Sequence, residues 1–115
     1  MHKHAISFRN AFVGIWTALA NQVNLRIHIL LGSLALLLAV YLELELSAIL
    51  IIILTISLVL TAELVNTAVE AVCDAVTLEH NPNIKIAKDV SAGAVLISAI
   101  FAVITGIIIF VPALI

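Results

Sequence analysis

Polar side chains in the middle of the chain recur at the spacing of an α-helix. Counted from Glu63, an amide and two further carboxylates follow at offsets of 3, 7 and 11 residues: Asn66, Glu70 and Asp74. At 3.6 residues per turn these offsets return to one helix face, and we call the four residues the polar stripe. Such oxygen ligands suit Mg²⁺, which uses one or two protein carboxylates and completes its shell with water and substrate phosphates. A carboxylate that faced a hydroxyl group could instead act as a general base.

The segments on both sides of the polar stripe are strongly apolar. Of the 115 residues, 64% are hydrophobic and 10% are charged, and the mean hydropathy is +1.32, far from the averages of soluble proteins. This composition indicates a membrane protein. A net charge of −2 without a basic run gives no indication of nucleic-acid binding. Because a carboxylate at the bilayer centre costs about 2.5 to 3.5 kcal/mol, acids beside a membrane span indicate a function.

Four helices are expected to position the polar stripe. Phe8, Phe12 and Ile15 recur at spacings of four and three residues, which predicts an amphipathic helix on the membrane surface. Three apolar segments then predict membrane spans, and the second continues into the cytoplasm as the helix that carries the stripe. We expect a single all-α membrane domain over residues 1–115, with the surface helix at about 6–20 and spans at about 26–42, 46–62 (continuing to about 76) and 91–111.

The cationic residues predict the orientation of these spans. Lys3, Arg9 and Arg26 precede the first span, and Lys85 and Lys88 lie between the second and the third. The positive-inside rule places both groups in the cytoplasm and the C-terminus outside. The polar stripe then lies on the cytoplasmic side, where ATP is available.

Four segments stand in an order and spacing that resemble a known family: SFRNAFVGIWTAL, NLRIH, AELVNTAVEAVCD and IKIAKDVSAGAVL. The sequence resembles the prokaryotic diacylglycerol kinases, small integral-membrane lipid kinases that include the undecaprenol kinases. The resemblance implies a surface helix and three spans per chain, a homotrimeric helical bundle, and active sites at the cytoplasmic membrane surface between subunits. It also implies direct transfer of the γ-phosphate from ATP, with Mg²⁺, to a lipid alcohol of the inner (cytoplasmic) membrane.

The resemblance implies roles for individual residues. Glu63 corresponds to the general base and Glu70 to a ligand of Mg²⁺, with Gln22 at the position of a second metal ligand. The implied nucleotide-binding residues are Lys3, Asn10, Glu79, His80, Asn81, Lys88 and Asp89. The implied residues on the lipid-substrate side are Asn24, Arg26, His28, Asn66 and Ala92.

Three positions depart from the pattern of the family. Gln22 stands where many members carry glutamate, Asn10 where a tyrosine is common, and Asn81 where a loop triplet usually ends in histidine. Glutamine keeps an oxygen ligand but lacks the charge. By analogy with calcium sites, whose affinity depends on the charge of the ligands, we expect weaker metal binding rather than an inactive site.

Several alternatives remain open at the level of sequence. The lipid is either a polyprenol or diacylglycerol, and the segments GIWTAL, NLRIH and IAKDVSAGAVL favour undecaprenol. Gln22 and Asn10 motivate a second hypothesis, a catalytically weakened relative that binds nucleotide or lipid without turning it over. The acids could also form a solvated face with Lys85 and Lys88 as counterions. An ion channel is disfavoured because the acids gather at one membrane face.

Overall fold

A computed structural model describes residues 7–115, which form four α-helices and, within that range, no β-strand. The helices are α1 (Phe8–Asn21), α2 (Val23–Tyr41), α3 (Leu46–Val76) and α4 (Pro82–Leu114). The last three are long and apolar enough to cross a membrane. The expected all-helical class with three candidate spans is therefore confirmed. Lys3 and the first residue of the expected surface helix lie outside the described residues.

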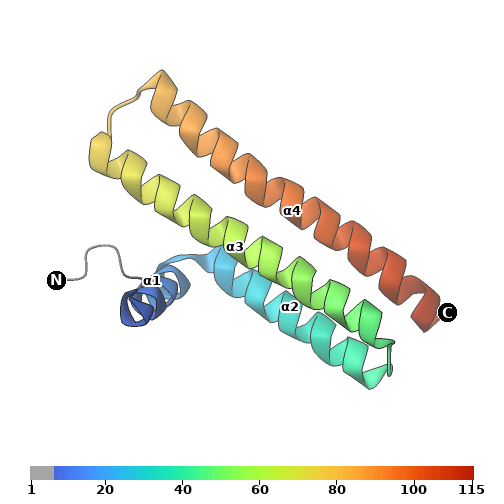
Figure 1. Ribbon diagram of the computed structural model, residues 1–115. Coiled ribbons are helices and arrows are strands. Elements are labelled where there is room, and N and C mark those ends of the chain that lie inside the picture. Colours follow the sequence, from blue (N-terminus) through green and yellow to red (C-terminus); the bar gives the residue numbers. More distant parts are fainter. Residues whose placement is uncertain (1–6) are drawn as a thin grey trace.

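The three long helices form a row of antiparallel neighbours, with α3 in the centre and α2 and α4 packed on its two sides (Figure 1). α1 lies across this row near the start of α2, and Figure 1 views it almost end-on. The 31 residues of α3 rise about 46 Å, which exceeds the roughly 30 Å hydrocarbon core of a bilayer. Together α3 and α4 extend past the start of α2, and this two-helix extension carries the C-terminal part of the polar stripe.

Side-chain caps explain where two of the helices begin. Ser7 accepts a hydrogen bond of 3.3 Å from the Asn10 backbone N–H and so caps α1. The side-chain oxygen of Asn81 accepts bonds from two backbone N–H groups, 2.9 Å from Asn83 and 3.3 Å from Ile84. Pro82 follows at the first helical position, where its missing N–H and fixed φ angle are favourable. These local contacts start α4 well before its apolar segment.

The tight turn between α2 and α3 depends on a left-handed residue. Glu43 has a φ of 55°, a conformation that usually favours glycine. Its backbone N–H bonds to the Val40 carbonyl, and the N–H of Leu44 bonds to the Ala39 carbonyl, both at 3.1 Å. This pair of bonds is the Schellman pattern that ends helices. It satisfies carbonyl groups at the end of α2 and reverses the chain into α3.

A close contact between α2 and α3 surrounds Gly32. A Cβ atom built there would lie 3.1 to 3.3 Å from three side-chain carbons of Ile56. Gly106 on α4 makes no such contact, since a Cβ there meets nothing within 4 Å in this chain. Hydroxyl groups inside α3 bond to carbonyls of their own helix, Thr55 to Ile51 and Ser57 to Leu54. Apolar packing and local hydrogen bonds thus account for the bundle.

The isolated chain has a very small interior. Six apolar residues are buried among those described: Ala18, Leu25, Ala39, Ile52, Val59 and Cys73. Cys73 is a free, buried cysteine, and such a residue behaves as a small hydrophobe. α4 has no buried residue at all. Lipid or further protein chains must therefore cover most of the apolar surface.

Candidate active site

Glu63 is the one buried charged residue in the described part of the chain, with 3% of its surface exposed. Its Oε1 atom lies 3.2 Å from Nε2 of His28, which reaches across from α2. Oε1 has no hydrogen-bond partner among residues 7–115. Because burial of an unsatisfied carboxylate is costly, this group calls for a functional explanation. Glu63 and His28, both expected in the site, are thus brought together.

A second cluster joins α3 to α4 one to two turns further along. The side-chain amide of Asn66 donates to Oε1 of Glu70 over 3.2 Å. The hydroxyl of Ser91 on α4 donates to the side-chain oxygen of Asn66 over 2.7 Å. All three side chains are partly buried. Asn66 therefore lies between a hydroxyl donor and a carboxylate acceptor, and these two partners fix the orientation of its amide.

Sequence reasoning did not assign a role to Ser91. Residues 91–94, Ser-Ala-Gly-Ala, have small side chains that permit close helix contact, a pattern that does not indicate a hydrogen bond between helices. Ser91 and Asn66 are 25 positions apart in the chain. Their contact follows only from the register in which α4 packs against α3, and the sequence does not show this register. Ala92, the adjacent residue expected on the substrate side, is exposed on α4.

The ligand set around Glu70 is compatible with Mg²⁺. Among residues 7–115 no three His, Cys, Asp or Glu side chains converge as a metal cluster. Mg²⁺ does not require one, because it commonly binds through one or two carboxylates and takes its other ligands from water and phosphates. Glu70 is partly exposed, and its hydrogen bond to Asn66 engages one of its two carboxylate oxygens. Gln22 lies at the junction of α1 and α2, where its side chain makes no capping hydrogen bond to α2.

Ion pairs join the charged residues of the two-helix extension. Lys88 on α4 lies 2.8 Å from the Asp74 carboxylate on α3. This hydrogen bond raises the pKa of Lys88, which precedes the uncharged segment 90–115. Lys85 pairs with Asp89 one turn later on α4. The idea that Lys85 and Lys88 act as counterions of the polar stripe therefore fits Asp74 alone, and not Glu63 or Glu70.

The loop residues expected near the nucleotide lie between α3 and α4. His80 is exposed, and the backbone N–H of Glu79 donates to the Thr77 hydroxyl over 3.0 Å. Asn81 is the cap of α4, so its side-chain oxygen already accepts two backbone bonds. Asn10, on the first turn of α1, is exposed. These positions are accessible to solvent, but no contact in the described residues brings them to the polar stripe.

Arg26 and Asn24 lie near the start of α2. The Arg26 guanidinium donates to the Ala20 carbonyl over 3.2 Å and so ties α2 to the end of α1. Asn24 is exposed two residues earlier. Both residues lie at the same end of α2 as His28. The three residues of this helix expected on the substrate side therefore lie near the junction of α1 and α2.

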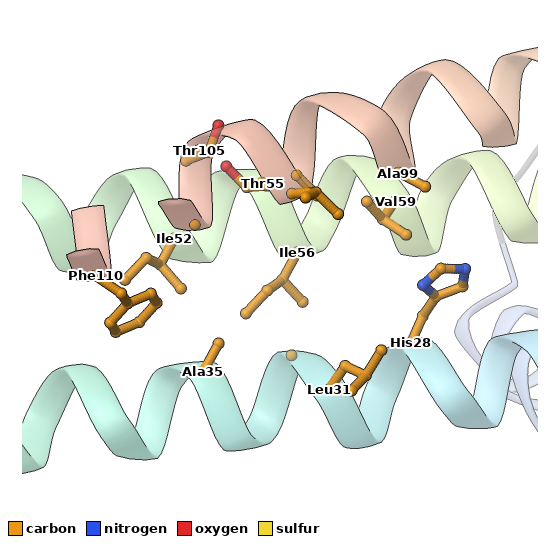
Figure 2. Close-up of a pocket in the computed structure, with 14 residues that line it drawn as sticks. His28, Leu31, Ala35, Ile52, Thr55, Ile56, Val59, Ala99, Thr105 and Phe110 are labelled. Carbon is orange, nitrogen blue, oxygen red and sulfur yellow. The ribbon is translucent and has the colours of Figure 1, made fainter. Parts of the chain in front are cut away.

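An apolar cavity of about 240 Å³ lies between α2, α3 and α4 (Figure 2). Its wall is made mostly of aliphatic side chains and includes Gly32 and Ile56, with the hydroxyl groups of Thr55 and Thr105 as polar exceptions. Figure 2 shows His28 at one end of the cavity and Phe110 toward the other. The end where His28 lies is the end where this residue contacts Glu63. A hydrocarbon chain in the cavity would bring a polar head toward the buried carboxylate.

Comparisons with known proteins identify relatives over almost the whole chain. The sequence model of the family described as prokaryotic diacylglycerol kinase matches residues 9–110. A "Diacylglycerol kinase" from Synechocystis sp. is 44% identical over 110 residues, which cover 95% of this chain and 63% of that protein. An "Undecaprenol kinase" from Bacillus subtilis is 37% identical over 108 residues, which cover 94% of this chain and 88% of that protein. The chain therefore spans less than two thirds of the first relative's length.

Both relatives bear the names of lipid kinases, and the family match covers the polar stripe, all of α2 and α3, and most of α4. The family expected from the motifs is confirmed. The fold agrees with a multi-pass membrane protein, because three helices are long and apolar enough to span a bilayer. The chain belongs to the prokaryotic diacylglycerol kinase family.

Proposed function

We propose that the protein is an ATP- and Mg²⁺-dependent lipid kinase that phosphorylates a membrane alcohol, undecaprenol in preference to diacylglycerol. The observation that carries this proposal is the buried carboxylate of Glu63, whose unsatisfied oxygen lies 3.2 Å from His28 at one end of an apolar cavity. A carboxylate in that position can accept a proton from a hydroxyl group at the head of a lipid. The names of the two relatives support the same class of reaction.

In the proposed reaction the lipid hydroxyl loses its proton to Glu63 while its oxygen forms a bond to the γ-phosphorus of ATP. The bond from that phosphorus to the ADP oxygen breaks, and ADP leaves. Phosphoryl transfer of this kind depends mainly on positioning and on neutralisation of charge. Glu70 and Gln22 would hold Mg²⁺, which when bound supplies positive charge at the phosphates. Asn66 holds the Glu70 carboxylate in place through its amide.

The nucleotide would lie beside the two-helix extension, in the cytoplasm. We assign Lys88 and Asp89 to this side, together with the loop residues Glu79, His80 and Asn81, and Lys3 and Asn10 of the N-terminal segment. Lys88 supplies a point charge that can exchange its partner Asp74 for a phosphate. The lipid would approach from the bilayer, past Asn24, Arg26, His28 and Ala92. The reacting groups would then meet where α2 begins.

We propose that residues 1–115 form one membrane domain that assembles as a homotrimer in the cytoplasmic membrane. α4 buries none of its residues in the single chain, so it offers a long apolar face to neighbouring chains. Positive residues before α2 and between α3 and α4 favour a cytoplasmic N-terminus and site, with the C-terminus outside. α1 would lie in the interface with its aromatic residues at headgroup depth.

The two candidate lipids can be separated by direct assay. Purified protein in mixed micelles would receive labelled ATP, Mg²⁺ and either undecaprenol or diacylglycerol at equal surface concentration. We expect labelled phosphate in undecaprenol at a higher kcat/KM than in diacylglycerol. A preference for diacylglycerol would overturn the assignment of the lipid. Absence of transfer to both lipids would overturn the kinase and favour the weakened relative that binds without turnover.

A further inference from the structure

The burial of Glu63 raises the question of where its proton goes after each turnover. Under the proposed function, one proton moves from the lipid hydroxyl to this carboxylate for every phosphate transferred. The next lipid can react only after Glu63 has lost that proton. Because 3% of Glu63 is exposed, direct release to water is obstructed. A neighbouring group that can both accept and release a proton would remove the obstruction.

His28 is the side chain in position to do this. Its Nε2 atom lies 3.2 Å from Oε1 of Glu63, and 24% of its side chain is exposed. Imidazole has two nitrogens, so it can take a proton on one nitrogen and release one from the other. We propose that His28 is a proton-relay residue that resets Glu63 between turnovers. This inference rests on the proposed function and adds to it.

Glu63 has no other ion-pair partner in the described part of the chain. Among residues 7–115, His28 is the one cationic side chain that lies within 4 Å of the Glu63 carboxylate. The cations of α4 have other partners, since Lys85 pairs with Asp89 and Lys88 with Asp74. Arg26, on the same helix as His28, donates to the Ala20 carbonyl of α1. The relay therefore depends on one side chain, which a substitution can isolate.

The proposed steps balance in atoms and charge. In the first step the hydroxyl O–H bond breaks, the proton passes to Glu63, and the O–P bond forms as ADP leaves. In the second step the O–H bond of the protonated carboxyl breaks and the proton passes to Nε2 of neutral His28, giving imidazolium beside carboxylate. In the third step the proton on Nδ1 leaves to water or buffer. Return of the remaining proton from Nε2 to Nδ1 through solvent restores the starting tautomer.

The relay predicts that His28 acts after the first phosphoryl transfer, when Glu63 must lose its proton, and not during the transfer itself. We would follow lipid phosphate formation by rapid quench with the lipid and ATP in excess over protein. The proteins would be wild type, Glu63→Gln, His28→Gln and His28→Ala. Glutamine retains a polar side chain of similar length but cannot carry a proton. Ser33→Ala, at an exposed position on the same helix, is the matched control.

We expect His28→Gln to form one lipid phosphate per site and then to continue at a rate at least about tenfold below that of its own first turnover, in line with typical effects of proton transfer. Added imidazole should accelerate this slow phase in His28→Ala, where the side chain leaves space, and should not restore Glu63→Gln. Ser33→Ala should behave as wild type. If His28→Ala does not fold in detergent, the two phases of His28→Gln decide the question.

Wild-type kinetics in His28→Gln would overturn the relay alone, as would equal slowing of the first and later turnovers in this variant. Equal slowing would assign His28 to packing or to the orientation of Glu63. Failure of imidazole to act on folded His28→Ala would also contradict the relay. Absence of transfer by the wild-type protein would overturn the proposed function and the relay with it.

Discussion

The hydroxyl of Ser91 on α4 donates a hydrogen bond of 2.7 Å to the side-chain oxygen of Asn66 on α3. With that oxygen engaged, the amide nitrogen of Asn66 points to Glu70, 3.2 Å away. A residue on one helix thereby sets the position of a carboxylate on another. The relationship connects the packing of α3 against α4 to the proposed binding of Mg²⁺.

Replacement of Ser91 tests this connection. Loss of one hydrogen bond is worth about 1 kcal/mol, which corresponds to roughly fivefold in an equilibrium constant. We therefore expect Ser91→Ala to raise the Mg²⁺ concentration for half-maximal activity about fivefold. Ser91→Thr keeps the hydroxyl and should stay close to wild type. Titration of lipid phosphate formation with Mg²⁺ gives both values, and equal Mg²⁺ requirements in the two variants would contradict the proposed role of Ser91.

Gln22 offers an independent test of the metal site. A glutamate there adds a negative charge to an oxygen ligand, and affinity for hard cations rises with the charge of the ligands. We expect Gln22→Glu to lower the Mg²⁺ concentration for half-maximal activity several-fold, on the order of the effect of one charged ligand. Gln22→Asn, which adds no charge, is the control. An unchanged Mg²⁺ dependence in Gln22→Glu would exclude this residue from the metal site.

Gly32 controls the distance between α2 and α3. A methyl group at this position meets Ile56 side-chain carbons at 3.1 to 3.3 Å, so Gly32→Ala must displace Ile56 or separate the helices. Overpacking of this kind costs typically about 1 to 3 kcal/mol. We expect a lower midpoint of thermal unfolding in detergent for Gly32→Ala. Gly14→Ala, where a Cβ meets nothing within 4 Å, should be neutral or stabilising because alanine favours helix. Equal stability of the two variants would refute the close contact.

The sequence was sufficient to predict features that depend on local periodicity. The spacing of the polar stripe placed Glu63 and Glu70 on one continuous helix, and α3 runs through both. The apolar segments predicted three helices that could cross a membrane, and three are present. The start of α4 at Pro82, ahead of the apolar segment expected at about 91, follows from the Asn81 cap, which a hydropathy pattern does not detect.

Contacts between helices were beyond sequence reasoning. Periodicity gives the direction of a side chain around its own helix but not what packs against it at each height. Glu63 and Asp74 share a face of α3, yet Glu63 is buried against α2 and Asp74 is exposed beside Lys88 of α4. The contact between His28 and Glu63 depends on the register of α2 against α3, as the role of Ser91 depends on α4.

The role of Glu63 as general base is the central claim, and its direct test is the rate of lipid phosphate formation by Glu63→Gln at saturating ATP, Mg²⁺ and lipid. Glutamine preserves the size of the side chain but cannot accept the proton. We predict a loss of at least about 100-fold in kcat, the lower range for general base catalysis, with Glu45→Gln in the exposed turn close to wild type. A Glu63→Gln variant with a kcat near that of wild type would contradict the account.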